Sequence, residues 1–208
     1  MFNGQKENDQ YKALLAEAGE FHGDICAGIE IGTRMTMCGL RKLGIVDPKG
    51  ADRKKLMVFV EIDRCATDAI MALTGCRPGK RTMKVLDYGK MAATFINLES
   101  QKAVRVALKR KKEAGEENVN NANPANLSDD ELFSITFVEV ALRPEDMPGK
   151  PLRRCRCVRC GENIMDGREF QEQGETLCKP CFERKNYYHV TADGHNNSYK
   201  IKNFQTTS

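Results

Sequence analysis

The sequence predicts one core domain of helices and strands, followed by a small module held together by zinc. Apolar residues recur at helical spacing over the first 44 residues and then form short strand-like runs from Leu56 onward. Farther along the chain, four cysteines form two C-x-x-C pairs. At 208 residues the chain is long for one domain and short for two full ones, so we expect a core domain with an appendage.

Two helices are predicted to open the core. Asp9 precedes apolar residues at helical spacing, and Gly19 marks the expected end of that helix. The second helix is expected to start with Asp24 as its N-cap and to stop at Gly44. Three glycines weaken this prediction but would permit close packing: Gly28, Gly32 and Gly39.

A series of strands is predicted after the second helix. Residues 56–62 indicate a buried strand, and residues 66–73 a short helix closed by Gly75. Further strands are expected at residues 82–86, 92–98, 103–108 and 135–142. Ser128 and Glu131 predict a capping box, and the asparagine-rich residues 113–126 a surface loop. A proline-rich linker follows, so we place the core domain at residues 1–148, the zinc module at 149–185 and a polar tail at 186–208.

The zinc module is predicted from four cysteines, Cys157, Cys160, Cys178 and Cys181. Seventeen residues separate the two pairs, enough for a hairpin that brings them together as one tetrahedral site with all positions filled. The segment has too few apolar residues for a core of its own, so the metal would fold it. The alternative is a redox dithiol pair. Cys155 is interpreted as a spare thiol.

Composition narrows the function classes. The net charge of +4 comes from mixed charges of both signs, so nucleic acid is not an expected partner. The start of the chain lacks the apolar stretch of a signal peptide, and no apolar run is long enough for a bilayer. Nine cysteines, an odd number, fit a reducing compartment. We therefore expect a cytoplasmic protein without a membrane segment.

A second cluster of reactive side chains is predicted in the core. His22, Asp24 and Cys26 bring an imidazole, a carboxylate and a thiol within five positions. With Asp24 as the N-cap, Cys26 would lie in the first helical turn, where the helix dipole favours a thiolate. The alternative is that His22 bonds a backbone group and Cys26 packs as a small apolar residue.

Cys65 opens the short helix after the first strand, at an edge where such proteins expose side chains. Cys76 lies just beyond that helix. A rise of about 1.5 Å per residue separates the two thiols by roughly 16 Å, too far to share one ion. Asp68, three residues after Cys65, either accepts a hydrogen bond from a ligand histidine or is a solvated carboxylate.

Five ordered motifs contain these residues: Phe21–Gly28, Glu61–Asp68, Thr74–Lys80, Asp87–Lys90 and Val104–Val106. Through them the chain resembles the FmdE family of formylmethanofuran dehydrogenase subunits, whose outline is F-H-G-H-x-C-x-G, E-x-D-x-C-x-x-D, T-G-C-x-x-G-K, D-Y-G-K and a V-R-V-like segment. The zinc module resembles the four-cysteine finger of some members. The chain departs from the pattern at Asp24, where the family has a second histidine, at Ala27 and at Arg81-Thr82.

The resemblance implies an α+β core with a mixed sheet, a fold likened to the substrate domain of glyceraldehyde-phosphate dehydrogenases, and a homodimer. It implies a functional pocket lined by His22 and Cys65 as candidate catalytic residues, with Cys26 and Cys76 nearby. Zinc or iron is the candidate second metal there. With Asp24 in place of an imidazole, such a site has lost affinity, changed its metal or become structural.

Two functional hypotheses follow. The first is a metal-binding protein related to that dehydrogenase component and to methanogenesis, either with protein partners in a dehydrogenase complex or as a small stand-alone enzyme. No pterin or iron–sulfur motif is recognised in the chain, which favours an accessory or stand-alone role. The second is a zinc-finger interaction protein that binds nucleic acid or a protein through arginines around the first cysteine pair: Arg153, Arg154, Arg156 and Arg159.

Overall fold

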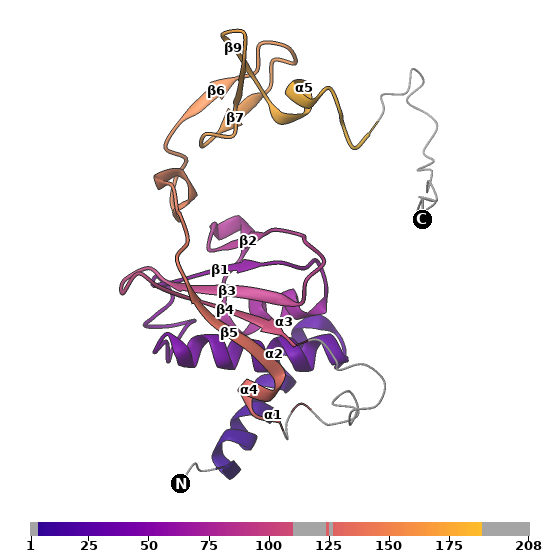
Figure 1. Ribbon diagram of the computed structural model, residues 1–208, viewed down its shortest axis with the longest axis vertical. Helices are drawn as coiled ribbons and strands as arrows, with labels where there is room; N and C mark the ends of the chain where they lie inside the picture. Colours follow the sequence, from indigo (N-terminus) through magenta and orange to yellow (C-terminus); the bar gives the residue numbers. More distant parts are fainter. Residues whose placement is uncertain (1–3, 110–123, 125–126, 189–208) are drawn as a thin grey trace. The chain divides into compact units, whose positions relative to one another are not determined.

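The computed structural model describes residues 4–109, 124 and 127–188 (Figure 1). It divides the chain into two compact units, residues 1–150 and 151–208. Most of the loop expected at 113–126 and most of the tail expected at 186–208 lie outside the described residues. No described helix combines the length and the apolar character needed to cross a membrane.

The first unit contains a five-stranded sheet with the order β2-β1-β3-β4-β5. Its strands are β1 (Leu56–Val60), β2 (Met83–Val85), β3 (Ala92–Asn97), β4 (Lys102–Leu108) and β5 (Phe133–Val138). Strands β1 and β2 pair in parallel, and the other neighbours pair antiparallel. The predicted α+β class with a mixed sheet is therefore confirmed.

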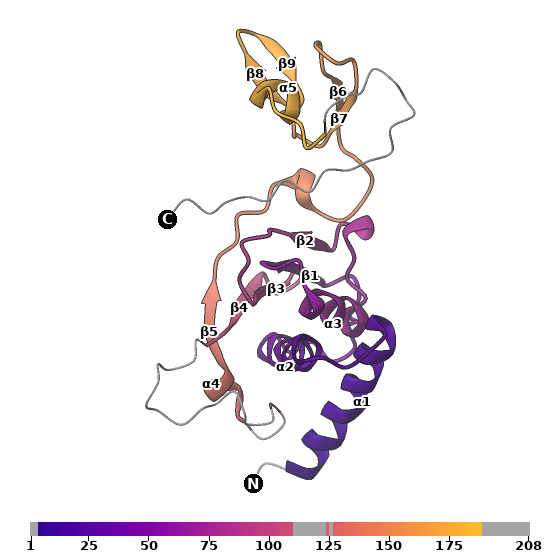
Figure 2. The same ribbon diagram turned by 90° about the vertical axis from the view of Figure 1, so that its right-hand side faces the viewer.

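Three helices lie on one side of this sheet, α1 (Gly4–His22), α2 (Ala27–Lys42) and α3 (Cys65–Thr74), with α2 and α3 between α1 and the strands (Figures 1 and 2). Helices α2 and α3 pack on each other, and α1 contacts both. The main core lies between α2, α3 and the sheet, where Val58, Val60 and Phe95 are fully buried. Met57 points to the opposite face, because side chains alternate along a strand, and there it packs beneath Val140 and Leu142.

The structure corrects the predicted boundaries of both opening helices. Helix α1 continues past Gly19 to His22. The glycine at position 19 makes room for Ile25, because a Cβ there would lie 2.6 Å from Ile25 Cγ1. Gly23, with φ of +107°, then turns the chain. Residues 24–26 form the connection, so Asp24 is not the N-cap. Cys26 is the N-cap of α2.

The remaining elements of the first unit are short. Helix α4 (Asp129–Leu132) begins with the predicted capping box of Ser128 and Glu131, which is confirmed. Gly75 closes α3 in the left-handed conformation, also as predicted. Strand β5 begins two residues earlier than expected and ends at Val138. The 3-10 helices η1 (Pro78–Lys80) and η4 (Pro144–Asp146) lie in the connections before β2 and after β5.

The second unit consists of two hairpins and a short helix. The first hairpin pairs β6 (Arg154–Arg156) with β7 (Asn163–Met165), the second pairs β8 (Phe170–Glu172) with β9 (Glu175–Leu177), and α5 (Lys179–Glu183) follows. The rings of Phe170 and Phe182 stack with centroids 4.7 Å apart and join β8 to α5. Apart from cysteine, the buried apolar residues of its core cluster are Ile164 and Leu177.

Candidate metal centres

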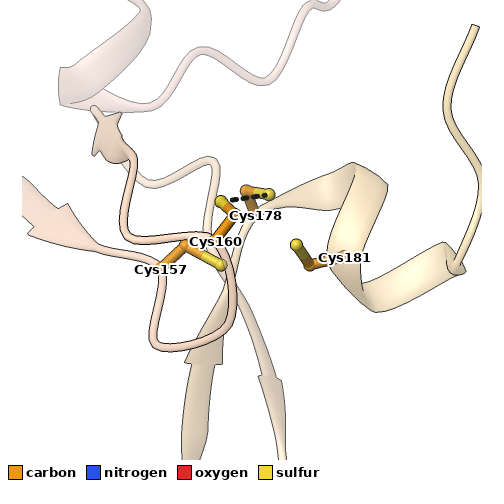
Figure 3. A group of neighbouring side chains, drawn as sticks. All are labelled: Cys157, Cys160, Cys178 and Cys181. Carbon is orange, nitrogen blue, oxygen red and sulfur yellow. Dashed lines mark hydrogen bonds between the residues drawn. The ribbon is translucent and has the colours of Figure 1, made fainter. Parts of the chain in front are cut away.

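The four cysteines of the second unit converge on one point (Figure 3). Cys157 and Cys160 come from the loop after β6, Cys178 follows β9, and Cys181 lies in α5. Their four sulfur atoms all lie within 4.8 Å of one another, and Cys160 Sγ is 3.8 Å from Cys178 Sγ. A tetrahedral zinc ion with bonds of about 2.3 Å would hold its sulfur ligands about 3.8 Å apart. The arrangement fits zinc with every position filled by protein.

The backbone around this cluster favours thiolates. The N–H groups of Cys160, Cys178 and Arg159 surround the sulfur of Cys157 and lower its pKa to about 6, against the opposing effect of burial. A thiolate is the form that binds metal. Cys155 lies on β6 and outside this cluster, as its interpretation as a spare thiol requires, and burial raises its pKa.

Three of the four arginines near the first cysteine pair make contacts within the module. Arg153 pairs with Glu169 at 2.9 Å, and Arg156 Nε donates to the carbonyl of Gly161 at 2.7 Å. Arg159 bridges Glu172, at 3.2 Å, and the carbonyl of Cys181. These contacts hold the hairpins and helix α5 around the cysteine cluster. They also occupy donors that the nucleic-acid hypothesis assigned to phosphates.

A second cluster in the first unit consists of His22, Cys26 and Cys65. His22 is the last residue of α1, Cys26 is the N-cap of α2, and Cys65 is the first residue of α3. One nitrogen and two sulfur atoms from these residues lie within 4.8 Å of one another. The cluster therefore joins the ends of α1, α2 and α3, although His22 and Cys65 are 43 positions apart in the sequence.

Asp68 orients the histidine of this cluster. His22 Nδ1 lies 2.8 Å from Asp68 Oδ2, and this hydrogen bond raises the pKa of the imidazole. Of the two interpretations left open for Asp68, the structure therefore shows the hydrogen-bond acceptor, in a carboxylate that is still partly exposed. A histidine whose Nδ1 is held by a carboxylate presents Nε2 to a metal. Asp24, which replaces the second histidine of the family pattern, lies 3.5 Å from that Nε2.

The contact between the two thiols shifts their pKa values in opposite directions. Burial acts to raise the pKa of Cys26, but the N–H groups of Ile29 and Gly28 and the thiol of Cys65 together lower it below its ordinary value. The pKa of Cys65 rises, first because of its hydrogen bond with Cys26. Gly28 permits this approach, because a Cβ there would lie 2.9 Å from Cys65 Cβ and 3.6 Å from Cys26 Sγ.

The structure brings His22 and Cys65 together as expected, while their catalytic role stays a prediction. Cys26, which was expected near this pocket, is the third member of the cluster, and its place in the F-H-G-D-I-C motif was the signal. The prediction that Cys76 lies near this pocket is wrong. Cys76 is 2% exposed, packs in the main core at the other end of α3 and contacts the carbonyl of Leu56. The length of α3 separates it from Cys65.

Together the fold and these clusters define a metal-binding protein with an α+β core and a four-cysteine module. A family model described as "FmdE, Molybdenum formylmethanofuran dehydrogenase operon" matches residues 21–135, more than half of the chain. The chain belongs to this FmdE family. A second model, the prokaryotic dksA/traR C4-type zinc finger, matches residues 150–187 and covers the four-cysteine cluster.

Two individual proteins are similar to this chain. A "Probable S-adenosyl-L-methionine-binding protein" of Archaeoglobus fulgidus is 29% identical over 91% of the chain, which spans only 58% of the length of that relative. The crystal structure of an FmdE-like protein of the tungsten formylmethanofuran dehydrogenase type, from Syntrophus aciditrophicus, is 22% identical. It superposes with a TM-score of 0.53 over 86% of this chain and 95% of the other, which establishes a shared fold.

Proposed function

We propose that this protein binds a transition metal at His22, Cys26 and Cys65, in addition to a structural zinc in the second unit. The observation that carries the proposal is the convergence of three ligand atoms within 4.8 Å, with Asp68 bonded to the imidazole of the candidate ligand. Imidazole and thiolate donors suit zinc or iron. A histidine whose second ring nitrogen is bonded to a carboxylate, next to a cysteine thiol, is typical of metal centres.

The two sites would differ in what they can do. The four-cysteine cluster leaves no position for a substrate, so its role is structural. The core cluster offers three protein ligands, which leaves a position open for an external molecule. An ion bound there would supply a Lewis acid. Around it, Asp68 would hold the imidazole in place, and the amino-terminal ends of α2 and α3 would stabilise the two thiolates.

Metal analysis of paired variants tests this proposal. Cys157→Ser with Cys178→Ser removes two ligands of the module, and Cys26→Ser with Cys65→Ser removes two of the core cluster. We expect about two metal ions per wild-type chain and one in each double variant, measured by elemental mass spectrometry. If the Cys157→Ser, Cys178→Ser variant binds no metal while circular dichroism shows that its core is still folded, this result would count against a second site.

The open position suggests a first ligand to test. Because the Archaeoglobus relative is named as a probable S-adenosylmethionine binder, we propose that molecule, whose amino and carboxylate groups can bind a metal ion. Calorimetric titration of the metal-loaded protein should show binding that Cys26→Ser with Cys65→Ser removes. Equal binding by that variant would show that S-adenosylmethionine does not bind at the core cluster.

We further propose that the protein acts beside a formylmethanofuran dehydrogenase as an accessory component, or alone as a small enzyme through His22 and Cys65. The family match supports this relationship. A homodimer, a link to methanogenesis and a likeness to the substrate domain of glyceraldehyde-phosphate dehydrogenases remain predictions. Light scattering of the purified chain, and co-purification with the dehydrogenase, test the first two.

A further inference from the structure

A cavity of about 830 Å³ in the first unit has a strongly basic lining. It lies among the residues before β1, the carboxyl end of α3, helix η1 and the segment after η4. None of the His22, Cys26 and Cys65 cluster lines it. Five cations do: Lys49, Arg53, Lys54, Arg77 and Lys80. Among the described residues that line the cavity, none is acidic.

Most of this positive charge lacks a counter-charge. Lys49 is paired with Glu17. The side chains of Arg53, Lys54, Arg77 and Lys80 form no ion pair with any described residue. The thiol of Cys76 in the wall adds no negative charge, because burial raises its pKa. Like charges around a hollow focus their field into it, so an anion inside would be stabilised.

Part of the cavity lining is apolar, and the cavity volume is large enough for a small organic ligand. Pro48, Leu98, Met147 and Pro148 line it together with the cations. Small-molecule sites usually measure about 300–1,000 Å³, and a single inorganic phosphate would fill little of this volume. A ligand that uses both kinds of lining carries several negative charges on one part and an apolar ring on another.

We propose that this cavity binds a nucleotide-like organic polyanion, with its phosphate groups among Arg53, Lys54, Arg77 and Lys80 and its ring against the apolar lining. This site goes beyond the proposed metal centre and needs no metal of its own. S-adenosylmethionine carries a sulfonium and an ammonium against one carboxylate, so its net positive charge makes it a poor ligand here.

Calorimetric titration of the zinc-loaded full-length protein with ATP tests the proposal. We expect ATP to bind at least about tenfold more tightly than adenosine, and more weakly as salt rises. Arg77→Gln with Lys80→Gln should weaken ATP binding about tenfold or more. The matched control is Lys12→Gln with Lys102→Gln, two exposed cations outside the cavity, which should leave the affinity unchanged. Equal binding of adenosine and ATP, unchanged affinity in the cavity variant, or no binding at millimolar ATP would overturn the proposal.

Two further measurements locate the ligand and separate it from the metal centre. Acylation of lysines followed by mass spectrometry should show that ATP protects Lys54 and Lys80 and leaves Lys12 reactive. Unprotected Lys54 and Lys80 at saturating ATP would contradict the proposed location. Cys26→Ser with Cys65→Ser should bind ATP as the wild type does. A loss of ATP binding in that variant would assign the nucleotide to the core metal and overturn this second site.

Discussion

At the scale of single residues, Glu61 explains why three of the five sequence motifs lie together. Its carboxylate accepts two hydrogen bonds from Arg105, at 2.6 and 2.8 Å. Its backbone carbonyl accepts from the N–H groups of Tyr88 and Lys90, both at 3.0 Å. One residue thus joins the E-x-D, D-Y-G-K and V-R-V segments. These hydrogen bonds give the three segments a structural role in the fold.

Replacing Glu61 with glutamine should destabilise the first unit by about 1–2 kcal/mol, because Arg105 would lose a charged, two-point partner. Arg105 lowers the pKa of Glu61 below its ordinary value of 4.5. A lowered carboxyl pKa stabilises the fold above the unfolded value and ceases to do so as pH falls through the folded value. The deficit should therefore be full at pH 7 and shrink below about pH 4.5. Denaturant titrations at several pH values measure it.

The control for this prediction is Glu20→Gln, which changes an exposed carboxylate with no described partner. Its stability should match that of the wild type over the same pH range. A deficit for Glu61→Gln that persists unchanged well below pH 4 would show that the ion pair is not its source.

Asp68→Asn tests the orientation of His22. We expect affinity for the core metal to fall about 10- to 100-fold, because an amide holds the imidazole less firmly and no longer supports its basicity. Zinc in the four-cysteine module should stay bound. Competition with a chelating dye, read as two separate dissociation steps, measures both. Asp63→Asn alters an exposed carboxylate five positions away and should leave both steps in place; an equal loss in the two variants would rule out the orienting role.

The same residues show the limits of sequence reasoning at this scale. A contact of Asp68 with the site was one of two interpretations that the sequence left open, because three positions on a helix bring it to the face of Cys65. The separation of Cys65 and Cys76 also followed from helix geometry. Cys26 was expected near this pocket, but in the first turn of α2 and not at its N-cap. The start of α2 depends on the turn at Gly23, which local propensity did not identify.

At the scale of elements, the glycines of α2 permit close packing rather than breaking the helix. A Cβ at Gly32 would lie 2.8 Å from the Cα of Ala66 on α3, and one at Gly39 would lie 2.3 Å from the ring of Phe95 on β3. Single-helix propensity counts these residues as unfavourable. Their benefit comes from contacts with α3 and β3, which lie far along the chain and are not visible in the local pattern.

Gly32→Ala should destabilise the first unit by about 1–3 kcal/mol, since the new methyl group meets backbone atoms that cannot move aside. Helix propensity alone predicts the opposite sign, a gain of about 1 kcal/mol. Thermal and denaturant unfolding distinguish the two. Gly79→Ala is the matched control, because a Cβ there meets no atom within 4 Å. A stabilised Gly32→Ala variant would show that α2 and α3 can separate at little cost.

At the scale of the whole molecule, the sequence was sufficient for the fold class and for the existence of a separate metal-folded module. Short apolar runs located the strands of the five-stranded sheet, and the cysteine spacing located the module. The order β2-β1-β3-β4-β5 was not predictable, because pairing partners depend on contacts between distant segments. The basic cavity was invisible for the same reason, since its cations come from segments separated by about 25 positions.

The division into two units predicts that metal loss in the second unit is local. Apart from cysteine, only Ile164 and Leu177 are buried in the core cluster of the described module, too little apolar area to offset the entropy of ordering it. Cys157→Ser with Cys178→Ser should therefore unfold residues 151–185 and leave the first unit folded. Hydrogen exchange with mass spectrometry should show fast exchange in peptides of the module alone. Cys155→Ser, which changes a thiol outside the cluster, should keep the zinc and the protection of the module. Persistent protection of the module without its zinc would mean that the hairpins and the Phe170–Phe182 stack are sufficient, and joint loss of protection in both units would mean that the two fold as one.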